Sequence, residues 1–182
     1  AFNLLENLLR WTRNQNGKTK IYATLFNLTP VARQVVSLFS AIANAKEIEL
    51  INRIEGKFDI FADEDMIKTV LRNLISNAIK FTYTGGQVEL SLADSGDYWT
   101  IYVKDNGKGI PKDLQAHLLK SDEYITTYGT HNEKGSGLGL ILCRDFIRMN
   151  KGKLHFYSQE GIGTTFYFTI PKASSSAEAV SR

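Results

Sequence analysis

Three polar side chains share one face of a stretch that otherwise has the pattern of an amphipathic helix. Asn73, Asn77 and Lys80 stand at positions i, i+4 and i+7 of the segment NLISNAIKFT, so a helix places them in one stripe. Carboxamide oxygens can bind a divalent metal ion, and an ammonium group can meet phosphate oxygens. The stripe therefore predicts a site for a metal ion with a polyphosphate, or else an ordinary solvated helix face.

Two common nucleotide-binding motifs do not account for the glycines of this chain. Gly17-Lys18-Thr19 ends like a Walker loop, but position 12 is a threonine where that motif needs glycine. A dinucleotide fingerprint that begins at Gly135 would need its third glycine at position 140, which is leucine. Both motifs fail on spacing.

The polar stripe has to be carried by a helix, expected from about Glu64 to Phe81 with Asp63 as its capping residue. A second helix is expected to start at Thr29-Pro30, where a capping hydroxyl precedes a proline. A third is expected at residues 137–150. Each has one apolar face, and these faces need a sheet to cover.

Apolar and β-branched residues predict several short strands. They are expected at residues 21–28, 49–54, 58–62, 88–92, 99–103, 153–158 and 164–171. Turn signals at 55–57, 95–97 and 160–163 join neighbouring strands, the last two as antiparallel hairpins. Because no βα unit repeats, we expect an α/β (α+β) two-layer sandwich. Its sheet is mixed and mostly antiparallel, with three helices packed on one face.

Composition narrows the class of protein. The 182 residues carry a formal net charge of only +3, which gives no electrostatic reason to expect nucleic acid as a partner. A single cysteine, Cys143, excludes an internal disulfide and fits a reducing compartment. No apolar run is long enough to span a bilayer, so a cytoplasmic domain is expected.

Residues 120–136 have no hydrophobic periodicity. A segment of this length without regular structure in a compact domain predicts a lid or binding loop.

Four segments together resemble the ATP-binding catalytic domain of bacterial two-component sensor histidine kinases, of simple or hybrid type. This domain belongs to a superfamily that includes gyrase, the Hsp90 chaperones and the MutL repair proteins. The segments are NLISNAIKF at 73–81, DNGKGIP at 105–111, GSGLGL at 135–140 and GIGTTF at 161–166. The resemblance covers roughly residues 19–171 and implies a Bergerat-type ATP-binding fold.

The resemblance also implies domain boundaries. Residues 1–18 are similar to the end of a dimerisation and phosphotransfer helix plus a linker, and residues 19–171 would form the catalytic domain. Residues 172–182 are mostly small and polar, and we expect a linker or disordered tail.

By the same resemblance, the cofactors are ATP and Mg²⁺. Asn77 matches the magnesium ligand of the family, Lys80 would meet phosphate oxygens, and Phe81 would lie against the adenine. Asp105 would accept a hydrogen bond from the exocyclic amine of adenine, which guanine cannot donate from its carbonyl. Taken alone, Asp105 could instead stabilise a turn.

Further nucleotide-binding positions are implied by the glycine-rich segments. They are Gly107, Gly109, Ile110, Lys134, Gly135, Gly137, Leu138, Gly139 and Thr165. Glycines let the backbone approach a base closely, and amides at a helix start can face phosphates. Lys134 could also be an ordinary solvated lysine, and Thr165 an ordinary strand residue.

Position 73 predicts which reaction is supported. Hydrolytic members of the superfamily carry a glutamate at the place that matches Asn73, and an amide cannot accept a proton from water. With Asn73, Asn77 and Lys80 as its catalytic residues, the chain should bind Mg-ATP, hydrolyse it poorly and transfer the γ-phosphoryl group to a histidine.

The partners implied are the phosphoacceptor histidine domain of the same parent protein and the receiver domain of a response regulator. The parent would be a homodimer anchored in the bacterial inner membrane. His117, His131 and His155 do not follow the acceptor pattern of the family, so this chain should not phosphorylate itself. Two alternatives stay open: a nucleotide-regulated non-catalytic interaction module of the same fold, and a hydrolytic ATPase of the same superfamily.

Overall fold

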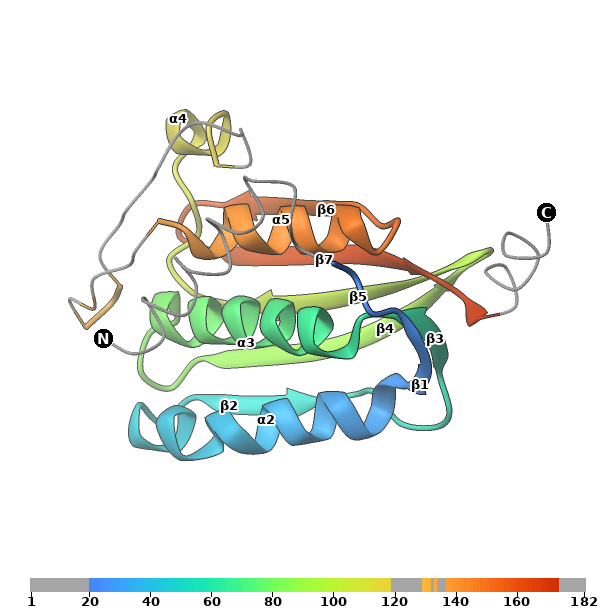
Figure 1. The fold of residues 1–182 in the computed structure, drawn as a ribbon. Helices are drawn as coiled ribbons and strands as arrows, with labels where there is room; N and C mark the ends of the chain where they lie inside the picture. Colours follow the sequence, from blue (N-terminus) through green and yellow to red (C-terminus); the bar gives the residue numbers. More distant parts are fainter. Residues whose placement is uncertain (1–19, 119–128, 132, 134–136, 174–182) are drawn as a thin grey trace.

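The computed structural model of residues 1–182 describes residues 20–118, 129–131, 133 and 137–173 (Figure 1). The strands are β1 (Thr24–Asn27), β2 (Glu49–Asn52), β3 (Asp59–Ala62), β4 (Gln87–Ser95), β5 (Tyr98–Asp105), β6 (Leu154–Gln159) and β7 (Gly163–Pro171). The helices are α2 (Leu28–Ala45), α3 (Glu64–Phe81), the short α4 (Lys112–Gln115) and α5 (Gly139–Met149).

The main sheet has five strands in the order β2-β4-β5-β7-β6. Only β2 and β4 pair in parallel, and the other neighbours are antiparallel. Helices α2, α3 and α5 lie side by side on one face of this sheet, with α3 in the middle (Figure 1). The predicted two-layer sandwich with a mixed, mostly antiparallel sheet and three helices on one face is confirmed.

Helix α3 has the bounds that the sequence predicts. The Asp63 side chain accepts a hydrogen bond from the backbone N–H of Met66, and Glu64 and Asp65 place negative charge in the first turn. Its apolar face is buried against the sheet and the two neighbouring helices. The helix is thereby fixed along its whole length, which fixes the polar stripe that it carries.

The start of α2 differs from the prediction. Asn27, not Thr29, is the capping residue, because its side chain accepts hydrogen bonds from the N–H groups of Thr29 and Phe58. The Thr29 hydroxyl instead donates to the carbonyl of Gly56. The strand expected at 21–28 is correspondingly shorter, because Leu28 is already the first residue of the helix.

The strands on either side of the turn at 55–57 do not pair with each other. β2 joins the main sheet beside β4, whereas β3 pairs with β1 in a separate two-stranded sheet. A turn signal between two strands predicts that the chain reverses, but not which strand becomes the neighbour.

The two predicted hairpins, β4–β5 and β6–β7, are confirmed and meet along the pairing of β5 with β7. Buried side chains alternate along both strands, with Ile101 and Val103 opposite Phe168 and Phe166. The same alternation turns Asp105 and its strand partner Thr164 toward the helices. This register places a carboxyl group at the end of the core, next to α3.

The boundary expected between residues 18 and 19 lies outside the described residues, which begin at 20, whereas the boundary expected between residues 171 and 172 lies within them. Lys172, placed in the expected tail, still belongs to the folded part. Its ammonium lies 2.6 Å from Asp94 Oδ1 and 4.3 Å from the ring centroid of Trp99. Its backbone N–H donates to the carbonyl oxygen of Asp97.

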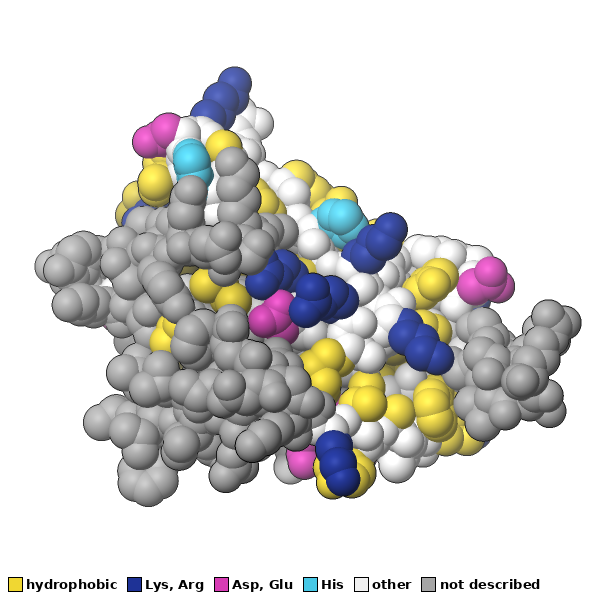
Figure 2. All heavy atoms as spheres, turned by 45° about the horizontal axis from the view of Figure 1, so that its top comes forward, with side chains coloured by type: hydrophobic (Ala, Val, Ile, Leu, Met, Phe, Trp, Pro, Cys, Tyr) yellow, Lys and Arg dark blue, Asp and Glu magenta, His cyan; other side chains and the backbone are white. Residues whose placement is uncertain are grey.

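The described surface is chemically mixed. Figure 2 shows basic side chains set among acidic and apolar ones on one face, in keeping with a formal net charge of +3. None of the described helices combines the length and the apolar character that crossing a bilayer requires.

Candidate functional site

A pocket opens between the C-terminal half of α3, the loop after β5, the short helix α4 and the start of β7. It encloses a cavity of about 120 Å³ that opens to solvent at its mouth. Its lining residues are Asn77, Ala78, Phe81, Asp105, Lys108, Gly109, Ile110, Pro111, Leu114, Leu118, Thr164 and Phe166. Most are apolar, so the few polar groups must orient any ligand.

Asp105 is the buried acid of this pocket. Its side chain is 7% exposed, and its Oδ1 accepts hydrogen bonds from the N–H groups of Gly107 (2.9 Å) and Thr164 (3.2 Å). Burial raises the pKa of this carboxyl to about 6, although the two backbone hydrogen bonds work in the other direction. The described residues make no hydrogen bond to Oδ2, which leaves that oxygen able to accept one from a ligand.

The threonine beside Asp105 is Thr164 rather than Thr165. Thr164 lines the pocket, and its hydroxyl lies 2.8 Å from that of Ser158. Thr165 pairs with Lys104 and Tyr157, so strand alternation turns its buried side chain to the opposite face of the sheet. Thr164, and not Thr165, therefore faces Asp105 and the pocket.

Close backbone contacts explain two of the predicted glycines. A Cβ atom on Gly107 would come within 2.2 Å of the carbonyl oxygen of Phe81, which also accepts a hydrogen bond from the N–H of Lys108. Gly109 has φ +67°, and a Cβ there would lie 2.1 Å from the carbonyl oxygen of Gln159. These contacts hold the loop after β5 between the end of α3 and the end of β6.

Two lysines lie over one aromatic ring near the pocket. The ammonium groups of Lys80 and Lys108 are 4.6 and 5.0 Å from the ring centroid of Phe81. Partial burial lowers the pKa of Lys80, and the charges of Lys108 and Lys46 act in the same direction, while Glu133 opposes them. Positive charge is thus concentrated beside the carboxamide of Asn77, where an anionic group of a ligand would be favoured.

The helix stripe and the start of α5 meet at Asn73. A Cβ on Gly139 would lie 2.8 Å from Asn73 Oδ1, and Asn73 Nδ2 donates to the carbonyl of Thr69. Leu138 caps α5 without a side-chain hydrogen bond, and Gly137 before it has φ +72°. Helix α5 therefore begins with backbone amides next to the polar stripe of α3.

The structure brings together only part of the predicted set. Asn77, Phe81, Asp105, Gly109 and Ile110 line the pocket. Asn73, Lys80 and Gly107 stand on α3 and on the loop after β5, which line the pocket with other residues. The remaining three, Gly137, Leu138 and Gly139, lie at the start of α5, where Gly139 faces Asn73. Lys134 and Gly135 lie outside the described residues.

Sequence reasoning missed Lys108, Thr164 and the apolar wall that α4 contributes through Leu114. The alternation Phe166, Phe168, Ile170 could have pointed to Thr164, since residues two apart share one face of a strand. Lys108 lies within the segment DNGKGIP that carries the resemblance, but no periodicity predicts that its side chain lines the pocket.

A metal ion would find few charged ligands in the described part of the chain. No group of three or more His, Cys, Asp or Glu side chains is placed there to hold one. One carboxamide, Asn77, suits an ion such as Mg²⁺ that takes most of its oxygen ligands from phosphates and water.

A sequence profile described as histidine kinase-, DNA gyrase B- and HSP90-like ATPase matches residues 62–174, more than half of the chain. The chain belongs to this family. Among the curated relatives, the adaptive-response sensory kinase SasA of Crocosphaera subtropica is 30% identical over 170 residues. These cover 92% of this chain and 44% of SasA, so the chain spans less than half of that relative.

Matches to solved structures support the same family assignment. The catalytic domain of histidine kinase ThkA matches with a TM-score of 0.70 and 31% identity, over 83% of this chain and 96% of ThkA. Full-length ShkA in complex with AMPPNP matches with a TM-score of 0.79 and 26% identity, over 94% of this chain and 35% of ShkA. ThkA in complex with the response regulator protein TrrA matches with a TM-score of 0.71 and 26% identity, over 96% of this chain and 50% of the ThkA chain. The predicted membership among sensor histidine kinase catalytic domains is confirmed.

Asp105→Asn should change how stability depends on pH. The pKa of Asp105 rises from 3.8 to about 6 on folding, so protonation favours the folded state. This contribution is complete below about pH 4 and disappears as pH rises through 6. It amounts to roughly 3 kcal/mol at about 1.4 kcal/mol per pKa unit.

Urea denaturation from pH 4 to pH 8 measures the effect. Relative to Asp105→Asn, the unchanged chain should lose unfolding free energy between pH 4 and pH 7. Asp113→Asn, at an exposed position of α4, is the matched control and should run parallel to the unchanged chain. A pH-independent difference between the unchanged chain and Asp105→Asn would contradict the burial argument.

Proposed function

We propose that this chain is the catalytic domain of a sensor histidine kinase that binds Mg-ATP. It transfers the γ-phosphoryl group to a histidine on a dimerisation domain, for relay to a response regulator aspartate. The observation that carries the proposal is the buried Asp105 in an apolar pocket, with Asn77 and Lys108 also in its lining.

Adenine recognition would rest on Asp105. Its Oδ1 is held by two backbone N–H groups, so the carboxyl cannot easily rotate away, and Oδ2 can accept from the exocyclic amine of adenine. Guanine carries a carbonyl at that position and would set two acceptors against each other. Phe81, Ile110 and Phe166 supply the apolar surface on which a flat base can lie.

The phosphates would extend toward the polar stripe. Asn77 is the residue that would hold Mg²⁺, and the bound ion would supply charge neutralisation of the phosphate oxygens. Lys80 and Lys108 would attract the same oxygens, and the first amides of α5 would add the positive end of a helix dipole. Transfer of a phosphoryl group depends mainly on such positioning and charge stabilisation.

Asn73 argues against a hydrolytic ATPase. Its Nδ2 donates to Thr69 and its Oδ1 faces Gly139, and neither end of a carboxamide can take a proton from an attacking water. A nucleotide-regulated, non-catalytic module keeps the same pocket, and only a transfer assay separates it from a kinase.

The partners and location are also proposals. The chain would act on the phosphoacceptor domain of its own parent, a homodimer held at the bacterial inner membrane, and a receiver domain would follow in the relay. The ThkA structure with TrrA and the ShkA structure with AMPPNP support a response regulator partner and a nucleotide ligand. Residues 1–18 would be the end of the dimerisation and phosphotransfer helix plus a linker, and residues 172–182 a linker or disordered tail.

Calorimetric titration of a non-hydrolysable ATP analogue tests the adenine pocket. We expect micromolar to sub-millimolar binding in the presence of Mg²⁺, weakened at least about 10-fold in Asp105→Asn, because a buried acceptor is lost. Asn77→Ala should reduce the gain in affinity that Mg²⁺ provides. Asp113→Asn should bind like the unchanged chain, and equal affinity of Asp105→Asn and Asp113→Asn would refute the assigned role of Asp105.

A transfer assay separates the three activities. With Mg-ATP alone, the chain should hydrolyse ATP slowly and should not acquire labelled phosphate itself. The dimerisation domain that the proposal places before residue 1, supplied in trans, should gain acid-labile phosphate, and Asn77→Ala should abolish the labelling. Steady ATP hydrolysis that Asn77→Ala abolishes would favour the hydrolytic ATPase, and binding without transfer or hydrolysis would favour the non-catalytic module.

A further inference from the structure

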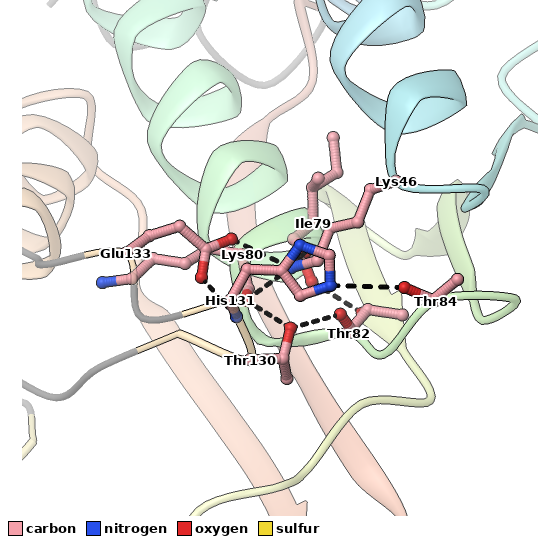
Figure 3. A network of polar contacts seen from close by, with 9 residues as sticks. Lys46, Ile79, Lys80, Thr82, Thr84, Thr130, His131 and Glu133 are labelled. Atoms are coloured by element: carbon pink, nitrogen blue, oxygen red, sulfur yellow. Dashed lines mark hydrogen bonds and ion pairs between the residues drawn. The ribbon is translucent and has the colours of Figure 1, made fainter.

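A buried lysine directly after α2 caps the C-terminal end of α3. Lys46, directly after α2, is 7% exposed, and its ammonium donates to the carbonyl oxygens of Ile79 (2.9 Å) and Lys80 (3.0 Å). It also lies 3.0 Å from Glu133 Oε1 (Figure 3). These three acceptors match the three N–H donors of an ammonium group, so the buried charge is fully hydrogen-bonded.

Residues 129–131 and 133, called here the docked turn, lie against the same helix end. The N–H of Thr130 donates to Lys80 O (3.1 Å), and the Thr130 hydroxyl donates to Thr82 O (2.8 Å). Figure 3 shows these residues converging on the last turn of α3. Glu133 also accepts from the N–H of His131 (2.8 Å) through its Oε2, so its carboxylate joins the docked turn to Lys46.

The ion pair between Lys46 and Glu133 is needed because of burial. A buried ammonium without a counter-charge is costly, and Glu133 is the carboxylate that reaches it. Burial alone would raise the pKa of Glu133, but backbone hydrogen bonds and the contact with Lys46 together lower it. Loss of Glu133 leaves the buried ammonium of Lys46 without a counter-charge, and loss of either partner removes the link between the docked turn and α2.

The docked turn also contacts side chains of the pocket region. A Cβ on Gly129 would lie 2.6 Å from Lys80 Cγ, so the turn packs directly on the Lys80 side chain. Lys80 in turn lies over the ring of Phe81, which lines the pocket. The position of Lys80 and Phe81 therefore depends on where the docked turn sits.

We propose that Lys46 is a positioning residue for this site. Through Glu133 it fastens the docked turn to the end of α3 and so holds Lys80 and Phe81 in the arrangement that binds the nucleotide. The nucleotide part of this inference rests on the function proposed above. The fastening itself does not, and the two can be measured separately.

Hydrogen exchange of the full chain, read on peptides that cover residues 129–133, measures the fastening without nucleotide. Lys46→Met keeps the aliphatic stem and removes the charge, and Glu133→Gln removes the charge at the more exposed partner. Both should speed exchange of the docked turn by roughly 10-fold. Because both variants break one link, the double variant should exchange no faster than either single variant.

Affinity for a non-hydrolysable ATP analogue measures the positioning. It should fall by roughly 5-fold in both variants. Lys57→Met is the matched control: Lys57 forms an exposed ion pair with Asp59 and follows Gly56, which contacts the opposite end of α2. Neither the exchange of the docked turn nor the affinity should change in this control.

Unchanged exchange in a folded Glu133→Gln chain would overturn the fastening, even if Lys46→Met failed to fold. Faster exchange with unchanged affinity would overturn the positioning role. If the unchanged chain bound no analogue, the proposed function would fail and the positioning role with it, while the exchange measurement would still decide whether Lys46 fastens the docked turn.

Discussion

The end of α3 leaves backbone carbonyls that the helix itself cannot satisfy, and three distant segments supply their donors. The helix ends at Phe81, and the next residue, Thr82, has an extended backbone conformation. Lys46 takes the carbonyls of Ile79 and Lys80, Thr130 shares that of Lys80, and the N–H of Lys108 takes that of Phe81. An α-helix must find partners for its last carbonyls, and here those partners bring a neighbouring helix, the docked turn and the loop after β5 to one place. Of these segments, the loop after β5 lines the pocket together with the last turns of α3.

The buried carboxyl of Asp105 carries a cost that fits a ligand site better than a purely structural one. Two backbone N–H groups hold Oδ1, but burial still raises the pKa to about 6. A residue chosen only to close the turn after β5 could do so in solvent, where the charge is not desolvated. A donor from a ligand would offset part of this cost. The folding free energy lost by burying the Asp105 carboxylate is therefore consistent with a role in binding a ligand.

The sequence predicted best where local signals and long-range packing agree. The bounds of α3 were predicted because a capping aspartate, an acidic first turn and a periodic apolar face all indicate one helix. Strand neighbours were predicted less well, since β2 and β3 are joined by a turn yet belong to different sheets. The resemblance predicts a role for Thr165, whereas strand register determines that the side chain beside Asp105 is that of Thr164. Lys46 and Glu133 lie 87 residues apart, and no local pattern indicates that they meet.

The central claim is that an adenine nucleotide binds in the pocket with its base against Asp105. A crystal structure of this chain with Mg²⁺ and a non-hydrolysable ATP analogue tests it most directly. We expect the exocyclic amine of adenine within hydrogen-bonding distance of the Asp105 carboxylate, the base against Phe81, and Asn77 Oδ1 bound to the metal ion. A nucleotide bound elsewhere, or a base in this pocket with no contact to Asp105, would contradict the account.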